Sequence, residues 1–191
     1  MIGLKDIARS GHVTRWHSVR VGRAQTIAEH HYLVTMLAQE MYRGIAKQDN
    51  PVQLLVLINY CLLHDTPELI MGDLPTPIKR RISQYCTEND YENPIDVIET
   101  GISPELAKLS DTIAETPLYY VAKLADIADA ILFLQQEGIG DHAIMVQEKI
   151  ELQFGQLIND AKKRFPDLHW QYANKVLNEV LNGRDSLLDY E

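Results

Sequence analysis

The sequence predicts an all-α protein, a single-domain helical bundle, and two observations lead to this prediction. No part of the 191-residue chain sustains the alternation of apolar and polar residues that is typical of a β-strand. Five helical segments open on a small polar residue directly before a proline, a pair that starts helices because the polar side chain caps the first turn and proline fits its backbone angles. Apolar residues at helical spacing follow all five pairs, which are Asn50-Pro51, Thr76-Pro77, Asn93-Pro94, Ser103-Pro104 and Thr116-Pro117.

Outside these segments, apolar residues at helical spacing predict a long helix over residues 27–46 and two more over 141–164 and 167–182. Residues 84–100 show the weakest pattern, so we expect a mobile loop or lid there. The tail GRDSLLDYE, residues 183–191, is expected to fray. No linker rich in Gly, Ser or charge divides the chain, so residues 1–191 are predicted to form one domain.

Composition and charge argue against several classes of protein. Hydrophobic residues make up 46% of the chain and charged residues 24%, as in ordinary globular proteins. No run reaches the roughly 18–20 uninterrupted apolar residues of a membrane-spanning helix, and the net charge of −9 argues against a general affinity for nucleic acid. Two cysteines, Cys61 and Cys86, do not make a disulfide framework, and the N-terminus lacks the pattern of a secretory signal. We therefore expect a cytoplasmic protein.

The helix predicted over residues 27–46 carries a histidine on its apolar face. His30 is in register, at i, i+3, i+4, i+7 and i+11, with Leu33, Val34, Leu37 and Met41. His31 points about 100° away from that face and is expected to be more exposed. A single inward histidine is more often a hydrogen-bonded core residue than a metal ligand, so His30 alone decides nothing.

Two further apolar segments bring acidic groups toward the interior. The segment VQLLVLINYCLLHDTPE is apolar almost all round and reaches the pair His64-Asp65 just before Pro67. Asp126 lies on an alanine-rich face of the segment PLYYVAKLADIADAILFLQQ. A buried carboxylate costs roughly several kcal/mol unless it is paired or bound to a metal. Asp129, one turn after Asp126, is a second ligand, an orienting group or an ordinary helix residue.

Taken together, His30, His64, Asp65 and Asp126 place two imidazoles and two carboxylates on three helices. This ligand set suits a divalent transition metal such as Co, Mn, Zn, Ni or Fe, with positions left for water and substrate oxygens. The four residues therefore predict a metal site as a set. The alternative is a purely structural bundle that binds no metal.

Three stretches carry a resemblance to a known family: RWHSVR…AEHH, LLHDTPELIMGDLPTPIK and KLADIADA. They resemble the HD-domain metal-dependent phosphohydrolases, whose pattern is a His, then a His-Asp doublet, then a distant Asp. Within that superfamily they are similar to bacterial 5′-deoxynucleotidases and to short phage-type dATP triphosphohydrolases. The resemblance covers roughly residues 11–136, where it implies the metal site and the substrate pocket, and it adds little over the C-terminal helices at 141–182. It also implies an HD-type bundle, located in the host cytoplasm if the protein comes from a phage.

Glu68 takes the position of the family's catalytic acid. Its spacing alone, i+4 from His64 and i+3 from Asp65, would place it beside the metal as general base or water orienter. A divalent ion there lowers the pKa of bound water and neutralises charge on a phosphoryl oxygen, and a second divalent ion on the phosphates is a further option. Asp73 belongs to the catalytic set, where it holds the site together or contacts substrate, unless it is only the acid of a Gly-Asp turn.

The candidate substrate-binding residues follow from charge and from the resemblance. Arg15, Lys79 and Lys123 are expected to clamp the phosphates, with Arg as bidentate partner and Lys as point charge. Trp16 resembles the family's sugar contact, where an aromatic plane packs on deoxyribose and excludes a 2′-hydroxyl, unless Trp16 is a core residue. Thr76 completes the expected substrate-binding set.

The predicted function is metal-dependent removal of the 5′ phosphate, or of the whole triphosphate, from a 2′-deoxynucleotide. We slightly favour the dNTP triphosphohydrolase, and the first alternative is a 5′-deoxynucleotidase acting on dNMPs. Further alternatives are an HD hydrolase of another phosphoester and a non-catalytic helical protein that binds metal and nucleotide. The expected partners are a small-molecule deoxynucleotide and further copies of the chain in a homo-oligomer, without nucleic acid or membrane. The base, the native metal and the number of subunits stay open.

Overall fold

The computed structural model describes residues 2–47 and 49–183. Across these residues the regular secondary structure is helical, and β-structure is limited to two isolated bridges, Thr14 with Thr26 and Val21 with Gly138. The all-α prediction is confirmed. The helices are α1 (Leu4–Ile7), α2 (Ile27–Ile45), α3 (Pro51–Leu63), α4 (Glu68–Met71), α5 (Thr76–Glu88), α6 (Pro94–Ile102), α7 (Pro104–Ile113), α8 (Pro117–Glu137), α9 (Asp141–Arg164) and α10 (Tyr172–Asn182).

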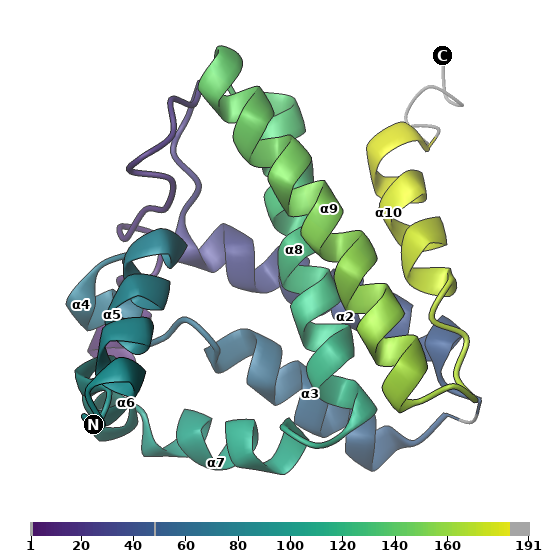
Figure 1. Cartoon of the computed structure of the whole chain (residues 1–191), viewed down its shortest axis with the longest axis horizontal. Coiled ribbons are helices and arrows are strands. Elements are labelled where there is room, and N and C mark those ends of the chain that lie inside the picture. Colours follow the sequence, from purple (N-terminus) through teal and green to yellow (C-terminus); the bar gives the residue numbers. More distant parts are fainter. Residues whose placement is uncertain (1, 48, 184–191) are drawn as a thin grey trace.

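The long helices α2, α8 and α9 form the centre of the bundle together with α3. Helix α8 runs along α9 and packs against α2, α3 packs on α2, and α10 covers α2 and α8 (Figure 1). Their shared core contains Met41, Leu57, Leu124, Ile131 and Phe154, all essentially inaccessible to solvent. Burying one such side chain stabilises a fold by about 1.5–3 kcal/mol. The core therefore holds α2, α3 and α8, the helices that carry the candidate metal ligands, in fixed positions.

The proline pairs start helices largely as predicted. Three polar residues accept hydrogen bonds from backbone N–H groups of the first turn, and these are Asn50, Asn93 and Thr116. Ser103 precedes α7 without a side-chain cap bond. The prediction of Thr76 as a cap is wrong, because Pro75 takes that position with extended backbone angles and α5 begins at Thr76 itself.

Two predicted segments differ from the structure. The expected loop over residues 84–100 is wrong, because α5 continues to Glu88 and α6 begins at Pro94. Cys86 and Ile95 are buried there and give these short helices a side that packs. The last helix begins at Tyr172 rather than at residue 167, because residues 165–171 form a turn in which the buried Trp170 Nε1–H donates to the Phe165 carbonyl at 2.8 Å. The predicted fraying of the tail concerns residues 184–191, which lie outside the described residues.

The stretch Pro51–Met71 is long and apolar enough to cross a membrane by length and composition alone. In the structure it is interrupted, since α3 ends at Leu63 and α4 begins at Glu68. The inner side of α3, with Leu57 and Cys61, belongs to the core. The apolar character of this inner side is therefore explained by its place in the bundle.

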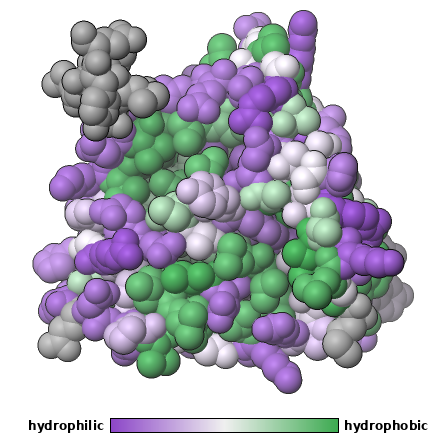
Figure 2. All heavy atoms as spheres, turned by 180° about the vertical axis from the view of Figure 1, so that it is seen from behind, coloured by the Kyte–Doolittle hydropathy of each residue, from purple (hydrophilic) through white to green (hydrophobic). Residues whose placement is uncertain are grey.

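The outer side of α3 is apolar as well. Val52, Leu55 and Leu62 are 70%, 57% and 45% exposed. Figure 2 shows apolar side chains gathered in patches on the face opposite to the one seen in Figure 1. No charged residue occurs between Pro51 and Leu63. This uncharged, partly apolar helix face is unusual for a chain with a net charge of −9.

Candidate metal centre and active site

The four candidate ligands come from helices whose ends are fixed locally. Helix α2 begins with a capping box: the Thr26 hydroxyl accepts from the Glu29 backbone N–H at 3.2 Å, and the Glu29 carboxylate accepts from the Thr26 N–H at 2.8 Å. His30 therefore lies one turn inside α2. His64 and Asp65 directly follow the last residue of α3, and Asp126 lies in the middle of α8.

The structure confirms the buried position of His30 and corrects that of His31. His30 is fully buried, whereas His31, expected to be more exposed, is only 7% exposed. Helix α2 packs against α3 as well as α8, so two of its sides are covered. The ring of His31 lies 5.0 Å from that of His64, and burial together with His64 lowers the pKa of His31 to about 3.

The ligand atoms converge at one point. His30 Nε2 lies 3.0 Å from His64 Nε2, 3.2 Å from Asp65 Oδ2 and 3.5 Å from Asp126 Oδ1. His64 Nε2 is 3.5 Å from the same Asp65 oxygen. His30, His64 and Asp65 offer ligand atoms that all lie within 4.8 Å of one another, and Asp126 borders this group on the side of His30.

Both imidazole rings are oriented through the nitrogen that faces away from this point. His30 Nδ1–H donates to Asp129 Oδ2 at 2.6 Å, and His64 Nδ1–H donates to the Cys61 carbonyl at 2.8 Å. Because a carboxylate and a carbonyl only accept hydrogen bonds, these contacts favour the proton on Nδ1 and turn the Nε2 lone pairs toward the shared point, although the Arg15 guanidinium, a donor, also contacts His30 Nδ1. Asp129, which the sequence left open, is therefore an orienting group for His30.

These residues fit a divalent metal ion. Two adjacent ligands bound at about 2.0–2.1 Å to one ion are about 2.8–3.4 Å apart in octahedral or tetrahedral geometry, and four pairs of ligand atoms here are 3.0 to 3.5 Å apart. Two Nε2 lone pairs that face each other at 3.0 Å repel unless a cation or proton lies between them. The donor set of two imidazoles and two carboxylates supplies both the geometry and the charge for such a cation.

The electrostatics of the centre also favour a positive charge. Burial and the Arg15 guanidinium lower the pKa of His30, but hydrogen bonds to Asp129 and Asp65 outweigh them and raise it to about 9. Burial acts to raise the pKa of Asp65, yet His64, His30 and Arg15 hold it well below its usual value. Without metal, a proton on His30 therefore compensates the carboxylates. A metal ion has to displace that proton, so its affinity rises with pH.

Glu68 stands at the start of α4 next to this centre. Its Oε1 accepts a hydrogen bond from Lys79 Nζ at 2.8 Å, and its Oε2 is buried without a partner among the described residues. Burial and the nearby Asp65 raise the pKa of Glu68 to about 8, although Lys79 acts in the opposite direction. An acid that titrates near neutral pH and keeps one oxygen free is suited to exchange a proton with a reacting water.

We expect Glu68→Gln to stabilise the metal-free protein at alkaline pH. The folded-state pKa of about 8 lies above the ordinary value of 4.5, so wild-type Glu68 contributes best when protonated and becomes unfavourable as the pH rises between these values. One pKa unit corresponds to ~1.4 kcal/mol, so the variant's advantage should grow by about 1–3 kcal/mol over that range. Urea unfolding of both proteins across the range measures it, and a difference that does not change with pH would contradict the assignment.

The predicted phosphate-binding cations all lie beside acidic residues of the centre. Arg15 contacts the His30 ring and lies 3.6 Å from Asp129 Oδ2, and Lys123 Nζ lies 3.8 Å from Asp126 Oδ2. Lys79 is engaged with Glu68, as described above. Thr76 is exposed at the first position of α5, one turn before Lys79. The structure thus brings Arg15, Lys79 and Lys123 to the rim of one acidic cluster.

Trp16 is half-buried rather than part of the core, and its backbone is unusual. Its φ of 71° lies in the left-handed region, which costs a bulky residue about 1–3 kcal/mol. The Trp16 backbone N–H donates to Asp73 Oδ2 at 3.2 Å, and the indole Nε1–H donates to Gln25 Oε1 at 2.9 Å. The ring stacks on Phe133, with centroids 5.7 Å apart and planes tilted by 12°. These contacts fix the indole next to the metal centre.

A match to a protein-family model decides the family. Residues 4–137 match the model of the 5′-deoxynucleotidase YfbR-like proteins, which spans every helix from α1 to α8. The chain belongs to this family. The match includes all four candidate ligands, Glu68 and the three cations, and the resemblance found in the sequence motifs is confirmed.

Two phage relatives are similar to this YfbR-like chain along most of its length, and a bacterial relative is similar over less than half of it. The dATP triphosphohydrolase of Acinetobacter phage SH-Ab 15497 is 29% identical over 95% of this chain and 92% of its own. That of cyanophage S-2L is 31% identical over 80% of this chain and 81% of its own. The 5′-deoxynucleotidase YfbR of Salmonella arizonae is 35% identical over 40% of this chain and 39% of its own.

One solved structure shares the fold. The cyanophage S-2L HD phosphohydrolase DatZ, bound to dA and one catalytic Zn²⁺ ion, superposes with a TM-score of 0.77 at 26% identity. The match covers 94% of this chain and 95% of that one. The predicted HD-type helical bundle is therefore confirmed.

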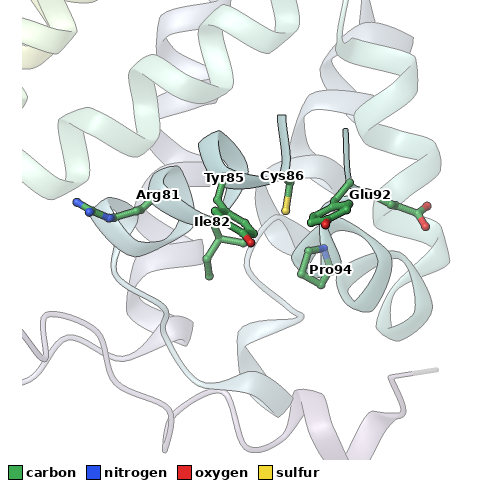
Figure 3. Close-up of a pocket in the computed structure, with 7 residues that line it drawn as sticks. Arg81, Ile82, Tyr85, Cys86, Glu92 and Pro94 are labelled. Carbon is green, nitrogen blue, oxygen red and sulfur yellow. The ribbon is translucent and has the colours of Figure 1, made fainter. Parts of the chain in front are cut away.

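A separate hollow of about 560 Å³ lies away from the metal centre of this YfbR-like protein, between α5 and the segment before α6. Figure 3 shows the side chains of Arg81 and Glu92 extending outward on opposite sides of it. Its lining is mostly apolar and consists of Arg81, Ile82, Tyr85, Cys86, Tyr91, Glu92 and Pro94. None of the candidate ligands or phosphate-binding cations lines this hollow, so we do not assign the substrate to it.

Sequence reasoning missed one buried polar residue of the site. Gln25 is 1% exposed and contacts both Trp16 and Asp129. It lies outside every apolar periodic segment, and its partner Asp129 is 104 positions away. No local signal marks such a residue, because its burial depends on α8 closing over the segment before α2.

Proposed function

We propose that the protein is a triphosphohydrolase of deoxynucleotides that converts dATP to deoxyadenosine and tripolyphosphate. The observation that carries this proposal is the extent of similarity. The phage dATP triphosphohydrolase matches 95% of this chain, including α9 and α10, whereas the Salmonella arizonae 5′-deoxynucleotidase matches 40%. The structural relative bound to dA likewise matches over 94% of the chain.

The second candidate is a 5′-deoxynucleotidase that removes inorganic phosphate from dNMPs. The match to the YfbR-like family model favours it. The two functions differ in the charge that the site must hold. Three cations beside the acidic cluster, Arg15, Lys79 and Lys123, suit the larger negative charge of a triphosphate better than that of a monophosphate.

For the cofactor, we propose one divalent transition metal ion held by His30, His64, Asp65 and Asp126. The ligand set admits Zn, Co, Mn, Ni or Fe, and Zn is the first to test because the structural relative carries it. When bound, such an ion supplies an activated water and neutralises charge on the phosphoryl oxygens. A second divalent ion on the phosphates would lie near the carboxylates outside this set, Glu68 and Asp73.

In this proposal the protein side chains hold the substrate and move the proton. Glu68, through its unpaired Oε2, accepts a proton from the water that attacks the α-phosphorus. The bond between that phosphorus and O5′ breaks, and the proton passes to O5′ of the departing deoxyadenosine. Arg15 binds phosphoryl oxygens with its planar fork, and Lys79 and Lys123 act as point charges. By lowering the pKa of Glu68, Lys79 helps to keep this residue in the carboxylate form that acts as a base.

The sugar and the start of α5 complete the binding site. We propose that Trp16 packs on the deoxyribose and leaves no room for a 2′-hydroxyl. Thr76 offers a hydroxyl at the N-terminus of α5, where backbone N–H groups also favour an anion.

The test is a substrate panel on metal-free protein reloaded separately with Zn, Co, Mn, Ni or Fe. We would assay dATP, ATP, dAMP, AMP and the other dNTPs, and quantify nucleoside release by chromatography. Release of deoxyadenosine from dATP, with ATP and dAMP much slower, is the expected result. Release from dNMPs alone would establish the 5′-deoxynucleotidase instead, and tight nucleotide binding without any release would establish a non-catalytic binding protein.

We also propose that the protein is a homo-oligomer that uses the uncharged face of α3. Two copies with a net charge of −9 repel one another least where they meet without charge, and Val52, Leu55 and Leu62 offer apolar area there. Light scattering during gel filtration should show a multiple of 21.8 kDa for the wild type and a lower mass for Leu55→Glu. A monomeric wild type would refute this.

The remaining parts of the proposal concern the setting of the enzyme. We propose that residues 1–191 act as one domain in a bacterial or phage-infected cytoplasm, as expected for relatives of phage and bacterial origin. The net charge of −9 supports a free nucleotide, rather than nucleic acid, as the substrate. A single-stranded DNA competitor that inhibits dATP hydrolysis at micromolar concentration would count against this.

A further inference from the structure

We propose that Gln25 is a positioning residue that holds Trp16 in register with the metal centre and thereby sets the discrimination between deoxyribose and ribose. This inference rests on the proposed function, in which Trp16 contacts the sugar. It assigns the selectivity to a pair of residues rather than to the aromatic ring alone.

The amide of Gln25 uses both of its ends inside the protein. Its Oε1 accepts hydrogen bonds from Trp16 Nε1–H at 2.9 Å and from Arg15 at 3.4 Å. Its Nε2 donates to the two carboxylate oxygens of Asp129, at 2.9 and 3.2 Å. The indole N–H only donates and the carboxylate only accepts, so the amide has a single orientation that satisfies both.

The far end of this network reaches the metal centre. Asp129 accepts from His30 Nδ1–H at 2.6 Å, and His30 Nε2 faces the other candidate ligands. A continuous chain of hydrogen bonds therefore runs from Trp16 through Gln25 and Asp129 to His30. A shift of the indole relative to the metal centre has to break or stretch one of these bonds.

The position of Gln25 is set independently of its side chain. The Arg15 backbone N–H donates to the Gln25 carbonyl at 2.9 Å, and the Ile27 N–H donates to the Val13 carbonyl at 2.9 Å. An isolated bridge between Thr14 and Thr26 joins the same two segments. Replacing the amide should therefore leave the local backbone in place and change only what Trp16 and Asp129 contact.

Trp16 needs the hydrogen bond to Gln25 because its backbone conformation is uncommon for a tryptophan. Its backbone has a φ of 71° and is held by Asp73, and one face of its ring packs on Phe133. The bond to Gln25 holds the Nε1 edge of the ring. Without it, the indole is free to slide on Phe133 and to open the space that a 2′-hydroxyl needs.

Two replacements of Gln25 test separately the hydrogen bonds made by the oxygen and by the nitrogen of its amide. Gln25→Met has similar volume and length but offers neither bond, whereas Gln25→Glu still accepts from the Trp16 Nε1–H and, as a carboxylate, repels Asp129 instead of donating to it. Gln39→Met is the matched control, since Gln39 lies on α2 and its amide donates to the Thr35 carbonyl, remote from Trp16. Trp16→Phe removes the indole N–H and so breaks the same hydrogen bond to Gln25 from the Trp16 side.

The first readout is the ratio of kcat/KM for dATP over ATP with reloaded metal. Losing one hydrogen bond from Trp16 should lower this ratio about tenfold in Gln25→Met. Trp16→Phe should lower it by a similar factor, and combining the two should lower it no further, because both remove one bond. Gln25→Glu should keep the ratio and lower kcat, and Gln39→Met should match the wild type.

The second readout does not need turnover. The chain contains two tryptophans, Trp16 and Trp170, so 5-fluorotryptophan labelling gives two ¹⁹F signals that Trp16→Phe assigns. In metal-free protein, Gln25→Met should shift or broaden the Trp16 signal and leave that of Trp170, buried near α10, unchanged. Gln25→Glu should leave the Trp16 signal near its wild-type position.

The outcomes distinguish this inference from the proposed function. A wild type that hydrolyses dATP and ATP equally refutes the function proposed for Trp16. A wild type that prefers dATP, with a Gln25→Met variant that keeps both the ratio and the Trp16 signal, refutes the role of Gln25 alone. Additive losses in the double variant also overturn it, because they would show that Trp16 and Gln25 act separately.

Discussion

Replacing Asp65 by Asn is expected to remove the metal ion and to abolish hydrolysis of dATP. Asp65 Oδ2 is the oxygen that lies within 3.2 Å of His30 Nε2 and 3.5 Å of His64 Nε2, so it faces both imidazoles at once. The asparagine side chain keeps the shape of the aspartate side chain and loses its negative charge. Since even partners outside the ligand shell are worth about 10- to 100-fold in metal affinity or activity, we expect a loss of at least about 100-fold in both.

The measurement is metal content after dialysis, with initial rates at saturating dATP. Asp160→Asn is the matched control, because Asp160 is exposed on α9 and, within residues 2–47 and 49–183, pairs only with Lys163. It should bind metal and turn over like the wild type. Full metal content in Asp65→Asn would show that the ion is held elsewhere, and the assignment of the centre would fail.

Replacing Glu68 by Gln should lower kcat for dATP by about 10²- to 10⁴-fold, the usual contribution of a general acid or base. Its metal content should stay near that of the wild type, because Glu68 lies outside the proposed ligand set. The buried Oε2, the raised pKa of about 8 and the position next to Asp65 all support a role in proton transfer.

Replacing a second carboxylate, Glu99, distinguishes the loss of the general base from the loss of an ion pair with Lys79. Lys79 Nζ lies 2.8 Å from Glu68 and 3.6 Å from Glu99, so Glu99→Gln also removes a negative charge beside Lys79. Glu99→Gln should change KM for dATP more than kcat. If both variants lost kcat equally, the loss would reflect the placement of Lys79, and Glu68 would not be the base.

The sequence was sufficient to predict the positions of the site residues that lie on or directly after regular helices. His30 could be placed on a buried face because α2 keeps helical spacing over its whole length, and the His64-Asp65 pair because it ends an apolar segment. The error at His31 shows what periodicity lacks: it gives the direction of a side chain but not how much of the helix its neighbours cover. The starts of α5 and α6 were predicted from their proline pairs, but their extent into residues 84–100 was missed, because each of these helices has only one side that packs.

The contacts that complete the site could not be predicted, because they join distant segments. Asp129 was recognised as a polar residue on the right helix, but its bond to His30 exists only because α8 packs on α2. Lys79 was expected near phosphate, and its pairing with Glu68 depends on the turn at Gly72, where φ is 78°. Gln25 carries no local signal at all. Each of these contacts depends on the tertiary packing of segments that are distant in the sequence.

The most direct test of the central claim is ³¹P and ¹H NMR of the products formed from dATP by the metal-loaded protein, since ³¹P detects the phosphates and ¹H the deoxyadenosine. The account predicts tripolyphosphate and deoxyadenosine in equal amounts from the first turnover, and neither product from the Asp65→Asn variant. Inorganic phosphate together with dADP, or products that form equally well with Asp65→Asn, would contradict it.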